Sequence, residues 1–267
     1  MNIHPKIFEK NSPEWIGDLI ERLSSNGFGY DFDCENDLNL IFIKECHLVL
    51  NLININTSYT PEEFIILQQK FYNKNLSLIH LWEDVFCSKP NQIIERIKSL
   101  AGKNIRVHGR KTEVFKITKP EADSFLNANH LQGTVSSRYK FGLFFNDELV
   151  AVATFSALRK MNHSENYKSI ELIRFAVKAG FSISGGLSKL IAYVRKNIKP
   201  DDVMSYADRD WSAGAAYLKL GFEQISKTQP QIFEIDENFN RSLIRTSDLT
   251  SNRKVFNTGS IKFILTF

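Results

Sequence analysis

The sequence predicts an α/β protein in which helices and strands alternate along 267 residues. Near the N-terminus, Ile16, Leu19, Ile20 and Leu23 recur at the spacing of one helix face. Elsewhere apolar residues alternate as in strands, and capping and turn residues separate the segments. A hydrophobic fraction of 43% and a charged fraction of 24% are ordinary for a globular chain with its own core.

Residues 1–103 predict a small α/β domain. The elements expected in order are a helix in 13–27, two strands in 38–56 joined near 44–47, a helix in 60–75, a buried strand in 76–86 and a helix in 89–102. Thr60 is the expected N-cap of the helix in 60–75, Pro61 its first residue and Glu63 the partner in a capping box. Gly102 is the expected end of the last helix.

The rest of the chain predicts a second, mixed α/β domain over 104–237 and a tail or edge hairpin over 238–267. Its expected elements are strands in 106–118, 139–158, 168–177 and 202–208, and helices in 119–131, 185–198 and 212–222. Asn146 and Asp147 lie between two alternating segments, as in the tight turn of a hairpin. No repeat or low-complexity linker separates the two parts, so we expect them to be joined directly.

The net charge of +4 is divided unevenly. Residues 1–103 carry ten Lys and Arg and 14 Asp and Glu, a net −4, so the remainder carries +8. We therefore expect any contact with DNA to involve residues 104–267 and a protein contact to suit the acidic N-terminal part; an ordinary solvated surface is the alternative. No apolar run approaches 18 residues, which predicts no membrane contact.

The N-terminal residues lack the pattern of a signal peptide, and the three cysteines are odd in number, without CxxC spacing. We expect these cysteines (Cys34, Cys46 and Cys87) to be reduced and buried in a cytoplasmic protein, with no structural zinc.

The segment "SYADRDWSAGAAYLKLGF", residues 205–222, places polar residues before a helix of small residues. The strand period puts Tyr206 and Asp208 on one face, with Asp208 at the carboxyl end, where α/β sheets usually bind ligands. Ser212 is the expected N-cap of the next helix and Gly221 its terminator. The structural alternative is that Asp208 and Ser212 only cap this helix while Tyr206 fills the core.

A second candidate is the turn "SGGLSKLI", residues 184–191, between a strand and an apolar-striped helix. Glycine amides at a helix N-terminus bind anions, because their N–H groups are unpaired and the helix dipole favours negative charge. The donor-binding candidates here are Ser184, Gly185, Gly186 and Lys189.

Together with "GAAYLKLGFE", this turn resembles the GNAT superfamily of acyltransferases. The resemblance implies that Tyr217 protonates a departing thiolate and that the turn holds the pyrophosphate of an acyl-CoA. The turn departs from the family pattern in its glycine spacing and in lacking a leading basic residue. The donor is therefore left open, with acyl-CoA as one candidate.

A closer resemblance covers residues 104–233. The segments "FLNANHLQG", "YKFGLFFNDELVAVATF", "ELIRFAV", "GGLSKL" and "SYADRDW" occur in the same order in the GNAT-like domain of phage and mobile-element proteins of homing-endonuclease type, and the domain is similar to Mom-type DNA-modifying proteins. The resemblance implies a host-cell cytoplasmic location and adds these candidates: His130, Gln132, Arg174 and Arg209. Trp211, which stands in the same polar cluster as Asp208 and Arg209, is a further binding candidate.

The chemistry of these candidates is consistent with a catalytic site. Asp208 beside Arg209 stays ionised and can orient an amine, and His130 titrates near neutral pH. Arg174 lies among apolar residues of its strand, so it either binds an anion or pairs with Asp208. As structural alternatives, His130 caps a helix and Trp211 only packs.

The segment "NLSLIHLWEDVFCSKPNQIIERIKSLAGKNIRVHGRK", residues 75–111, resembles the closing strand, helix and linker of PD-(D/E)XK nucleases related to very-short-patch repair enzymes. In that comparison Asn39 and Asn51 stand where the family has its metal-binding Asp and Glu, and amides do not supply the negative charge that hard cations need. Glu83 and Asp84 are the carboxylates that remain nearby. The resemblance therefore implies a degenerate nuclease with no metal site.

The leading hypothesis is an inactive nuclease-like domain followed by a GNAT-like transferase acting on DNA or a nucleobase. Tyr206, Asp208, Tyr217 and His130 are its candidate catalytic residues. The alternatives are a DNA-binding module without catalysis and a residual homing-type endonuclease, which Asn39 and Asn51 disfavour.

Overall fold

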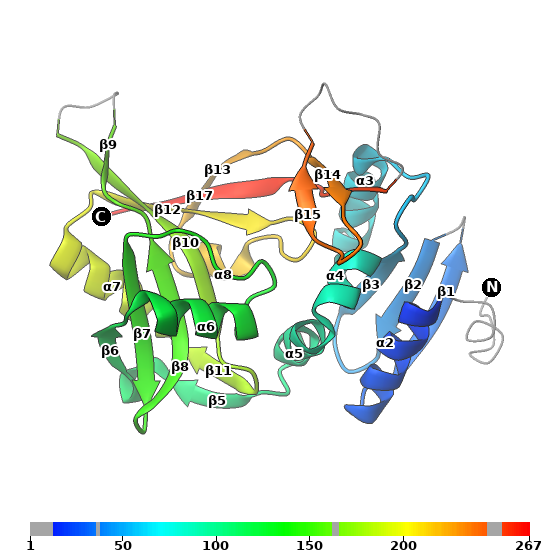
Figure 1. Ribbon diagram of the computed structural model, residues 1–267, viewed down its shortest axis with the longest axis horizontal. Coiled ribbons are helices and arrows are strands. Elements are labelled where there is room, and N and C mark those ends of the chain that lie inside the picture. Colours follow the sequence, from blue (N-terminus) through cyan, green and yellow to red (C-terminus); the bar gives the residue numbers. More distant parts are fainter. Residues whose placement is uncertain (1–12, 36–37, 162–165, 245–252) are drawn as a thin grey trace. The chain divides into compact units, whose positions relative to one another are not determined.

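The computed structural model describes residues 13–35, 38–161, 166–244 and 253–267, which fold as mixed α/β in two compact units (Figure 1). Unit 1 comprises Met1–Ala101, Asp208–Ala213 and Thr228–Ser260, and unit 2 comprises Gly102–Ala207, Gly214–Lys227 and Ile261–Phe267. The boundaries expected at 103/104 and 237/238 stay predictions. No helix within the described ranges is long and apolar enough to cross a membrane.

Unit 1 is built on a four-stranded sheet in the order β1-β2-β3-β4. Its strands are β1 (Tyr30–Glu35), β2 (Leu38–Ile43), β3 (Leu48–Ile53) and β4 (Ser77–Trp82). The first three are antiparallel neighbours, and β4 runs parallel to β3. All six residues of β3 are buried, as its continuous apolar sequence indicates.

The helices of unit 1 are α2 (Glu14–Ser25), α3 (Pro61–Tyr72), α4 (Glu83–Ser88) and α5 (Pro90–Leu100). The capping box of α3 is confirmed, since Glu63 N donates to Thr60 Oγ1 at 3.3 Å and Thr60 N donates to Glu63 Oε2 at 2.8 Å. The strand expected over 76–86 is wrong beyond Trp82, because Glu83 begins α4. The expected burial of the cysteines is also wrong, since all three are only partly buried.

A three-stranded sheet from the C-terminal part of the chain also belongs to unit 1. It contains β14 (Ile232–Ile235), β15 (Arg241–Leu243) and β16 (Lys254–Phe256), in the order β15-β14-β16. Ile235, Val255 and Phe256 share an apolar cluster with Phe64 and Trp82 of the N-terminal part. This burial explains why residues so far apart in the sequence fold together.

Unit 2 is built mainly on an eight-stranded sheet in the order β13-β17-β12-β10-β8-β7-β6, with β9 paired to β10. Its strands are β6 (Glu113–Lys116), β7 (Tyr139–Phe145), β8 (Glu148–Phe155), β9 (Arg159–Lys160), β10 (Lys168–Val177), β12 (Asp202–Asp208), β13 (Glu223–Lys227) and β17 (Ser260–Thr266). The β7–β8 turn is confirmed: Asn146 and Asp147 have φ angles of 50° and 61°.

The final strand, β17, lies inside this sheet between β13 and β12. From the sequence we expected a tail or an edge hairpin over 238–267, and a position inside the sheet was not predicted. The sequence signal for this strand is only a short alternation of apolar residues, in which the side chains of Ile261 and Phe263 are 6% and 0% exposed. Burial stabilises such apolar side chains most when their strand has a neighbouring strand on each side.

The remaining elements of unit 2 are β5 (Ile105–His108), η1 (Gly109–Lys111), α6 (Lys119–Asn129), β11 (Phe181–Ser184), α7 (Gly186–Ile198) and α8 (Ala215–Lys219). β5 and β11 form a two-stranded parallel sheet. The helix expected over 212–222 is shorter at both ends, and Gly214, not Ser212, is its N-cap. Gly221 follows the helix with a φ of 85°, as expected of a terminator.

Candidate functional site

The site in unit 2 begins where two parallel strands part. β10 and β12 are paired over four residues, from Ser169 with Asp202 to Leu172 with Ser205. Immediately beyond Leu172, a shift in the register of β10 against β8 falls between Leu172 and Arg174. Ligands bind at the carboxyl ends of parallel strands, where neighbouring strands diverge.

Tyr217 of α8 reaches this point through its hydroxyl. Ser205 Oγ donates to the Leu172 carbonyl at 2.9 Å and lies 2.9 Å from Tyr217 Oη. Because a serine hydroxyl has one proton, Tyr217 is the donor in the second bond. The Tyr217 ring stacks on Phe263 with centroids 5.2 Å apart and meets Phe222 edge-on at 5.3 Å. The phenol is therefore fixed by a buried serine and by two rings.

The strand period predicted for β12 agrees with its burial. Val203, Ser205 and Ala207 are buried, whereas Tyr206 is 41% exposed. The structural alternative that Tyr206 fills the core is therefore wrong. Its side chain is accessible on the face opposite Ser205.

The turn before α7 has open space beside Gly185. Gly185 is the N-cap of α7 with a φ of 76°, and no atom lies within 4 Å of where its Cβ would be. A Cβ at Gly186 would instead lie 2.8 Å from the Ile183 side chain, and one at Gly109 would lie 3.0 Å from the Gly185 and Gly186 backbone. An anion can therefore approach from the open side of Gly185.

A basic residue does lie beside this turn, but it comes from another segment. β11 pairs with β5, and Arg106 Nε donates to Ser184 Oγ at 2.8 Å. The missing leading base of the turn is thus matched by a guanidinium that the sequence analysis overlooked. The signal was the basic run "RVHGRK", whose partner the sequence does not reveal.

Lys189 points its ammonium at this same region. Lys189 Nζ donates to the carbonyls of Gly109, at 3.0 Å, and Thr112. These contacts fix η1 against α7. The role of Lys189 in binding a donor stays a prediction.

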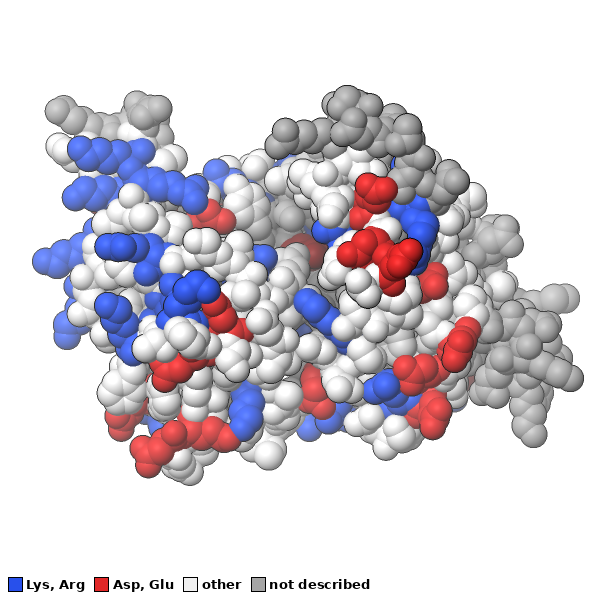
Figure 2. Space-filling view, viewed as in Figure 1, with Lys and Arg blue, Asp and Glu red and all other residues white. Residues whose placement is uncertain are grey.

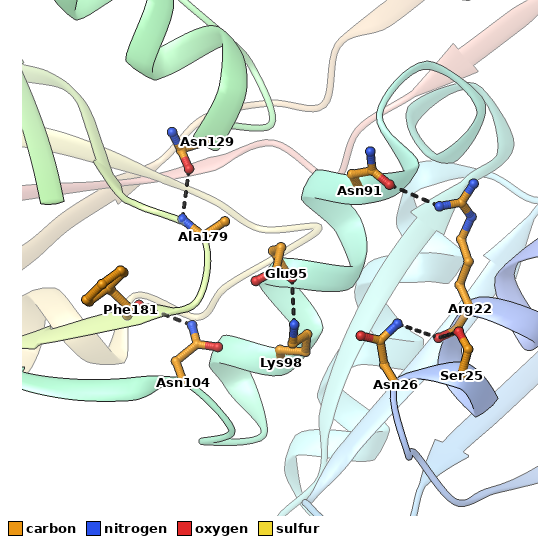
Figure 3. Close-up of polar contacts among 10 residues, drawn as sticks. All are labelled: Arg22, Ser25, Asn26, Asn91, Glu95, Lys98, Asn104, Asn129, Ala179 and Phe181. Atoms are coloured by element: carbon orange, nitrogen blue, oxygen red, sulfur yellow. Dashed lines mark hydrogen bonds and ion pairs between the residues drawn. The ribbon is translucent and has the colours of Figure 1, made fainter. Parts of the chain in front are cut away.

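Two asparagines hold the connection from β10 to β11 (Figure 3). Asn129 Oδ1 accepts from Ala179 N at 2.8 Å, and Asn104 Nδ2 donates to the Phe181 carbonyl at 3.1 Å. The position of β11, and hence of the Gly185 turn, depends on these contacts.

The structure brings together two segments singled out in the sequence, "NHLQG" and "ELIRF". Arg174 Nε donates to the Gly133 carbonyl at 3.2 Å, and its Nη1 donates to the Ile173 carbonyl at 3.0 Å. His130 is the C-cap of α6, and its Nδ1 accepts from Gln132 N at 3.1 Å. A neutral imidazole held in this way carries its proton on Nε2, which suits a hydrogen-bond donor.

The other candidates, Asp208, Arg209, Trp211 and Ser212, belong to unit 1. The Asp208 carbonyl accepts from Trp211 N at 3.2 Å and from Ser212 N at 2.9 Å. Arg209 Nη1 donates to the Thr258 carbonyl at 2.8 Å, and burial lowers the pKa of Arg209. These residues form a compact turn, and their roles at a site stay predictions.

Asp210 is a neighbour of this turn that the sequence analysis did not single out. It is 3% exposed, its Oδ1 accepts from Thr258 N at 2.9 Å and from Thr258 Oγ1 at 2.6 Å, and its own N–H donates to Asp208 at 3.0 Å. Burial first, and the nearby Asp208 charge second, raise the pKa of Asp210 to about 7.

The carboxylates expected as survivors of a nuclease site have structural partners. Asp84 is 1% exposed and accepts from Arg241 Nε at 2.6 Å and Nη2 at 2.9 Å. Glu83 Oε2 accepts from Ile55 N at 2.9 Å. Within the described ranges, no group of three or more His, Cys, Asp or Glu residues could hold a metal ion.

The sequence matches no family model and no curated protein. Among solved structures, it is similar to an acetyltransferase from Bacillus subtilis in complex with CoA, with 16% identity, a TM-score of 0.39, and coverage of 59% of this chain and 99% of that chain.

It is also similar to a GNAT family acetyltransferase from Elizabethkingia anophelis with acetyl-CoA bound (15% identity, TM-score 0.37, 59% of this chain and 99% of that chain). A third similar structure is the ribosomal-protein-S18-alanine N-acetyltransferase from Escherichia coli (17% identity, TM-score 0.37, 58% of this chain and 93% of that chain). GNAT acetyltransferases are thus among its structural neighbours.

Proposed function

We propose that unit 2 is a GNAT-like transferase that moves an acyl group from a CoA-type donor to an amine of DNA or a nucleobase. The observation that carries this proposal is the Tyr217 phenol, which Ser205 holds at the point where β10 and β12 part. A fixed phenol at the carboxyl ends of diverging parallel strands is placed to exchange a proton with a ligand bound between them.

The donor turn fits an anionic group in part. The open space beside Gly185, the amides of the first turn of α7 and the Arg106 guanidinium together suit a phosphate. Gly109 covers the opposite side of the turn, so the pyrophosphate of a donor would contact Gly185 and Arg106 and little of the Gly186 amide.

When bound, an acyl-CoA supplies an activated thioester. Tyr217 Oη would donate its proton to the departing sulfur, and Ser205 would then turn its hydroxyl from the Leu172 carbonyl to the phenolate oxygen. The exposed Tyr206 hydroxyl and the His130 Nε2–H would orient the acceptor. The amine proton would pass to a base in solution; Asp208 is a candidate base from the sequence alone, because it belongs to unit 1.

Positive charge supports DNA as the source of the acceptor. Residues 104–267 carry a net +8, and Figure 2 shows Lys and Arg side chains gathered on unit 2 around β9 and α7. Both residues of β9, Arg159 and Lys160, are exposed, as are Arg195 and Lys196 at the end of α7. Phosphate contacts by such residues supply affinity without sequence readout.

The test combines donor binding with product detection. Acetyl-CoA binding is measured by calorimetry, and transfer by CoA release in the presence of single- and double-stranded oligonucleotides, whose nucleosides are then examined by mass spectrometry. Tyr217→Phe removes the hydroxyl but keeps both ring contacts. It should lower the transfer rate by about 100-fold or more while donor affinity stays within about twofold.

Tyr193→Phe is the matched control, because Tyr193 packs in the same apolar cluster on α7 but not at the strand opening. It should leave the rate unchanged. Absence of acetyl-CoA binding, or full activity in Tyr217→Phe, would contradict the proposal.

The charge of unit 2 also favours a second candidate, a DNA-binding module without catalysis. Such a module should bind duplex DNA with a steep salt dependence and tolerate both Tyr217→Phe and Asp208→Asn. New modified nucleosides in cells expressing the protein, absent with Asp208→Asn, would exclude it.

We further propose that the N-terminal part is nuclease-like, of mobile-element type, and inactive. The amides Asn39 and Asn51 support this, because they lack the negative charge that a divalent cation needs, and so do the protein partners of Glu83 and Asp84. Purified protein with Mg²⁺ or Mn²⁺ should not cut duplex DNA. Cleavage that Glu83→Gln or Asp84→Asn abolishes would refute this proposal.

A further inference from the structure

Unit 1 contains a pocket of about 310 Å³ between β2, β3 and the loop that follows β3. This volume is at the lower end of the range of small-molecule sites, about 300–1,000 Å³. Its polar lining is rich in amides, and none of the described residues that line it is charged. The lining residues that carry the argument are Asn39, Asn51, Asn54, Asn56, Tyr59 and Phe64.

Asn51 lines this pocket and has an acceptor that no described residue uses. It is 1% exposed, and its Nδ2 lies 3.0 Å from His80 Nδ1. His80 Nε2 lies 3.2 Å from the Phe64 carbonyl, which can only accept, so Nε2 carries the proton and Nδ1 accepts from Asn51. Burial lowers the pKa of His80 to about 3, which keeps the ring neutral. Asn51 Oδ1 is then buried with no partner among the described residues.

The other three amides present donors. Asn54 Oδ1 accepts from Trp15 Nε1 at 2.9 Å, and Asn56 Oδ1 accepts from Lys254 N at 3.4 Å. Asn39 Oδ1 accepts from Cys34 Sγ at 3.8 Å. In each of these residues the carbonyl end is occupied by the protein. The NH₂ ends are therefore the groups left to donate to a ligand.

An aromatic wall completes the site. The rings of Tyr59 and Phe64 stack with centroids 5.4 Å apart and an interplanar angle of 27°, and Tyr59 is only partly buried. The pocket thus combines one buried acceptor, several amide donors and an aromatic surface. A planar, neutral ligand with N–H donors beside ring acceptors complements all three features.

We propose that this pocket binds a neutral nucleobase, as a free nucleoside or as one base of a single strand. A base N–H would donate to Asn51 Oδ1, ring nitrogens or carbonyls would accept from the neighbouring asparagines, and the ring would contact Tyr59. Amide side chains pair well with base edges, and aromatic rings stack on bases. A phosphate or a cation is disfavoured, because no described residue that lines the pocket carries an opposite charge. The inference does not depend on the transferase proposal, which concerns unit 2.

The test titrates the full chain with the four deoxynucleosides and with single-stranded homo-oligonucleotides, using calorimetry and ligand-observed NMR. We expect saturable binding of at least one nucleoside. Asn51→Leu and Tyr59→Leu should each weaken that binding by about tenfold or more. Asn91→Leu is the matched control, because Asn91 belongs to the same unit, is exposed and contacts Arg22 on α2 (Figure 3).

Comparison of nucleoside binding with oligonucleotide binding identifies the source of the base, and the second variant covers the case of misfolding. Nucleoside binding lost in both pocket variants supports a free ligand, and binding of oligonucleotides alone, lost in the same variants, supports a base within a strand. If Asn51→Leu does not fold, Tyr59→Leu decides. Absence of binding to both ligand types, or binding that Tyr59→Leu leaves unchanged, would overturn the proposal.

Discussion

Gly214 lies against Phe263, which stacks on Tyr217, and one substitution can measure how much this packing contributes to stability. It is the N-cap of α8 with a φ of 78°, and a Cβ at this position would lie 2.2 Å from Phe263 Cζ. Phe263 is 0% exposed and stacks on Tyr217. Gly214→Ala therefore introduces both backbone strain and a collision with a ring that has no solvent-exposed space to enter.

The two effects can be separated because Gly185 shares one of them. Gly185 caps α7 with a φ of 76°, but no atom lies within 4 Å of its Cβ position. A left-handed alanine costs about 1–2 kcal/mol, which is the whole expected loss for Gly185→Ala. Overpacking adds about 1–3 kcal/mol, so Gly214→Ala should lose about 2–5 kcal/mol of unfolding free energy.

The assay is urea unfolding followed by circular dichroism, together with hydrogen exchange of peptides from β17, which report on unit 2. Exchange of β17 should accelerate much more in Gly214→Ala than in Gly185→Ala. Equal losses in the two variants would refute the packing argument, because backbone strain alone would then account for both.

Three further predictions concern titratable groups. Because the pKa of Asp210 is raised from 3.8 to about 7, the folded protein holds this proton more strongly than the unfolded chain, so stability should fall as pH rises between these values. Urea titrations should show that fall in wild type and not in Asp210→Asn. The pKa of His80 is lowered from 6.5 to about 3, so its contribution is lost as pH falls through this window, and His80→Gln should flatten that part of the profile. Burial and the Glu83 charge raise the pKa of Cys87 to about 11, so iodoacetamide should modify Cys87 at pH 8 more slowly in the folded protein than in urea; equal rates would contradict this.

Local signals in the sequence determined the elements that carry the site. The Thr60–Glu63 capping box, the Asn146–Asp147 turn and the period of β12 depend on residues close in the chain, and all three are present. The N-cap predicted at Ser212 was wrong. A serine before small residues favours an N-cap, but α8 begins two residues later, where Gly214 can adopt a positive φ.

Long-range pairing decided what the sequence could not. Tyr217 was a candidate from its motif, but its bond to Ser205, its stack on Phe263 and the placement of Arg106 beside Ser184 join residues 12 to 78 positions apart. The same holds for β17 inside the large sheet and for the assignment of residues 208–213 and 228–260 to unit 1. The sequence by itself therefore determined several of the helices, strands and turns, because propensity and capping act within a few residues, but it did not predict β1 and placed the end of β4 at residue 86 instead of Trp82. Only the tertiary structure decided which side chains meet, because burial stabilises contacts between residues far apart in the sequence, and no local pattern identifies the partner.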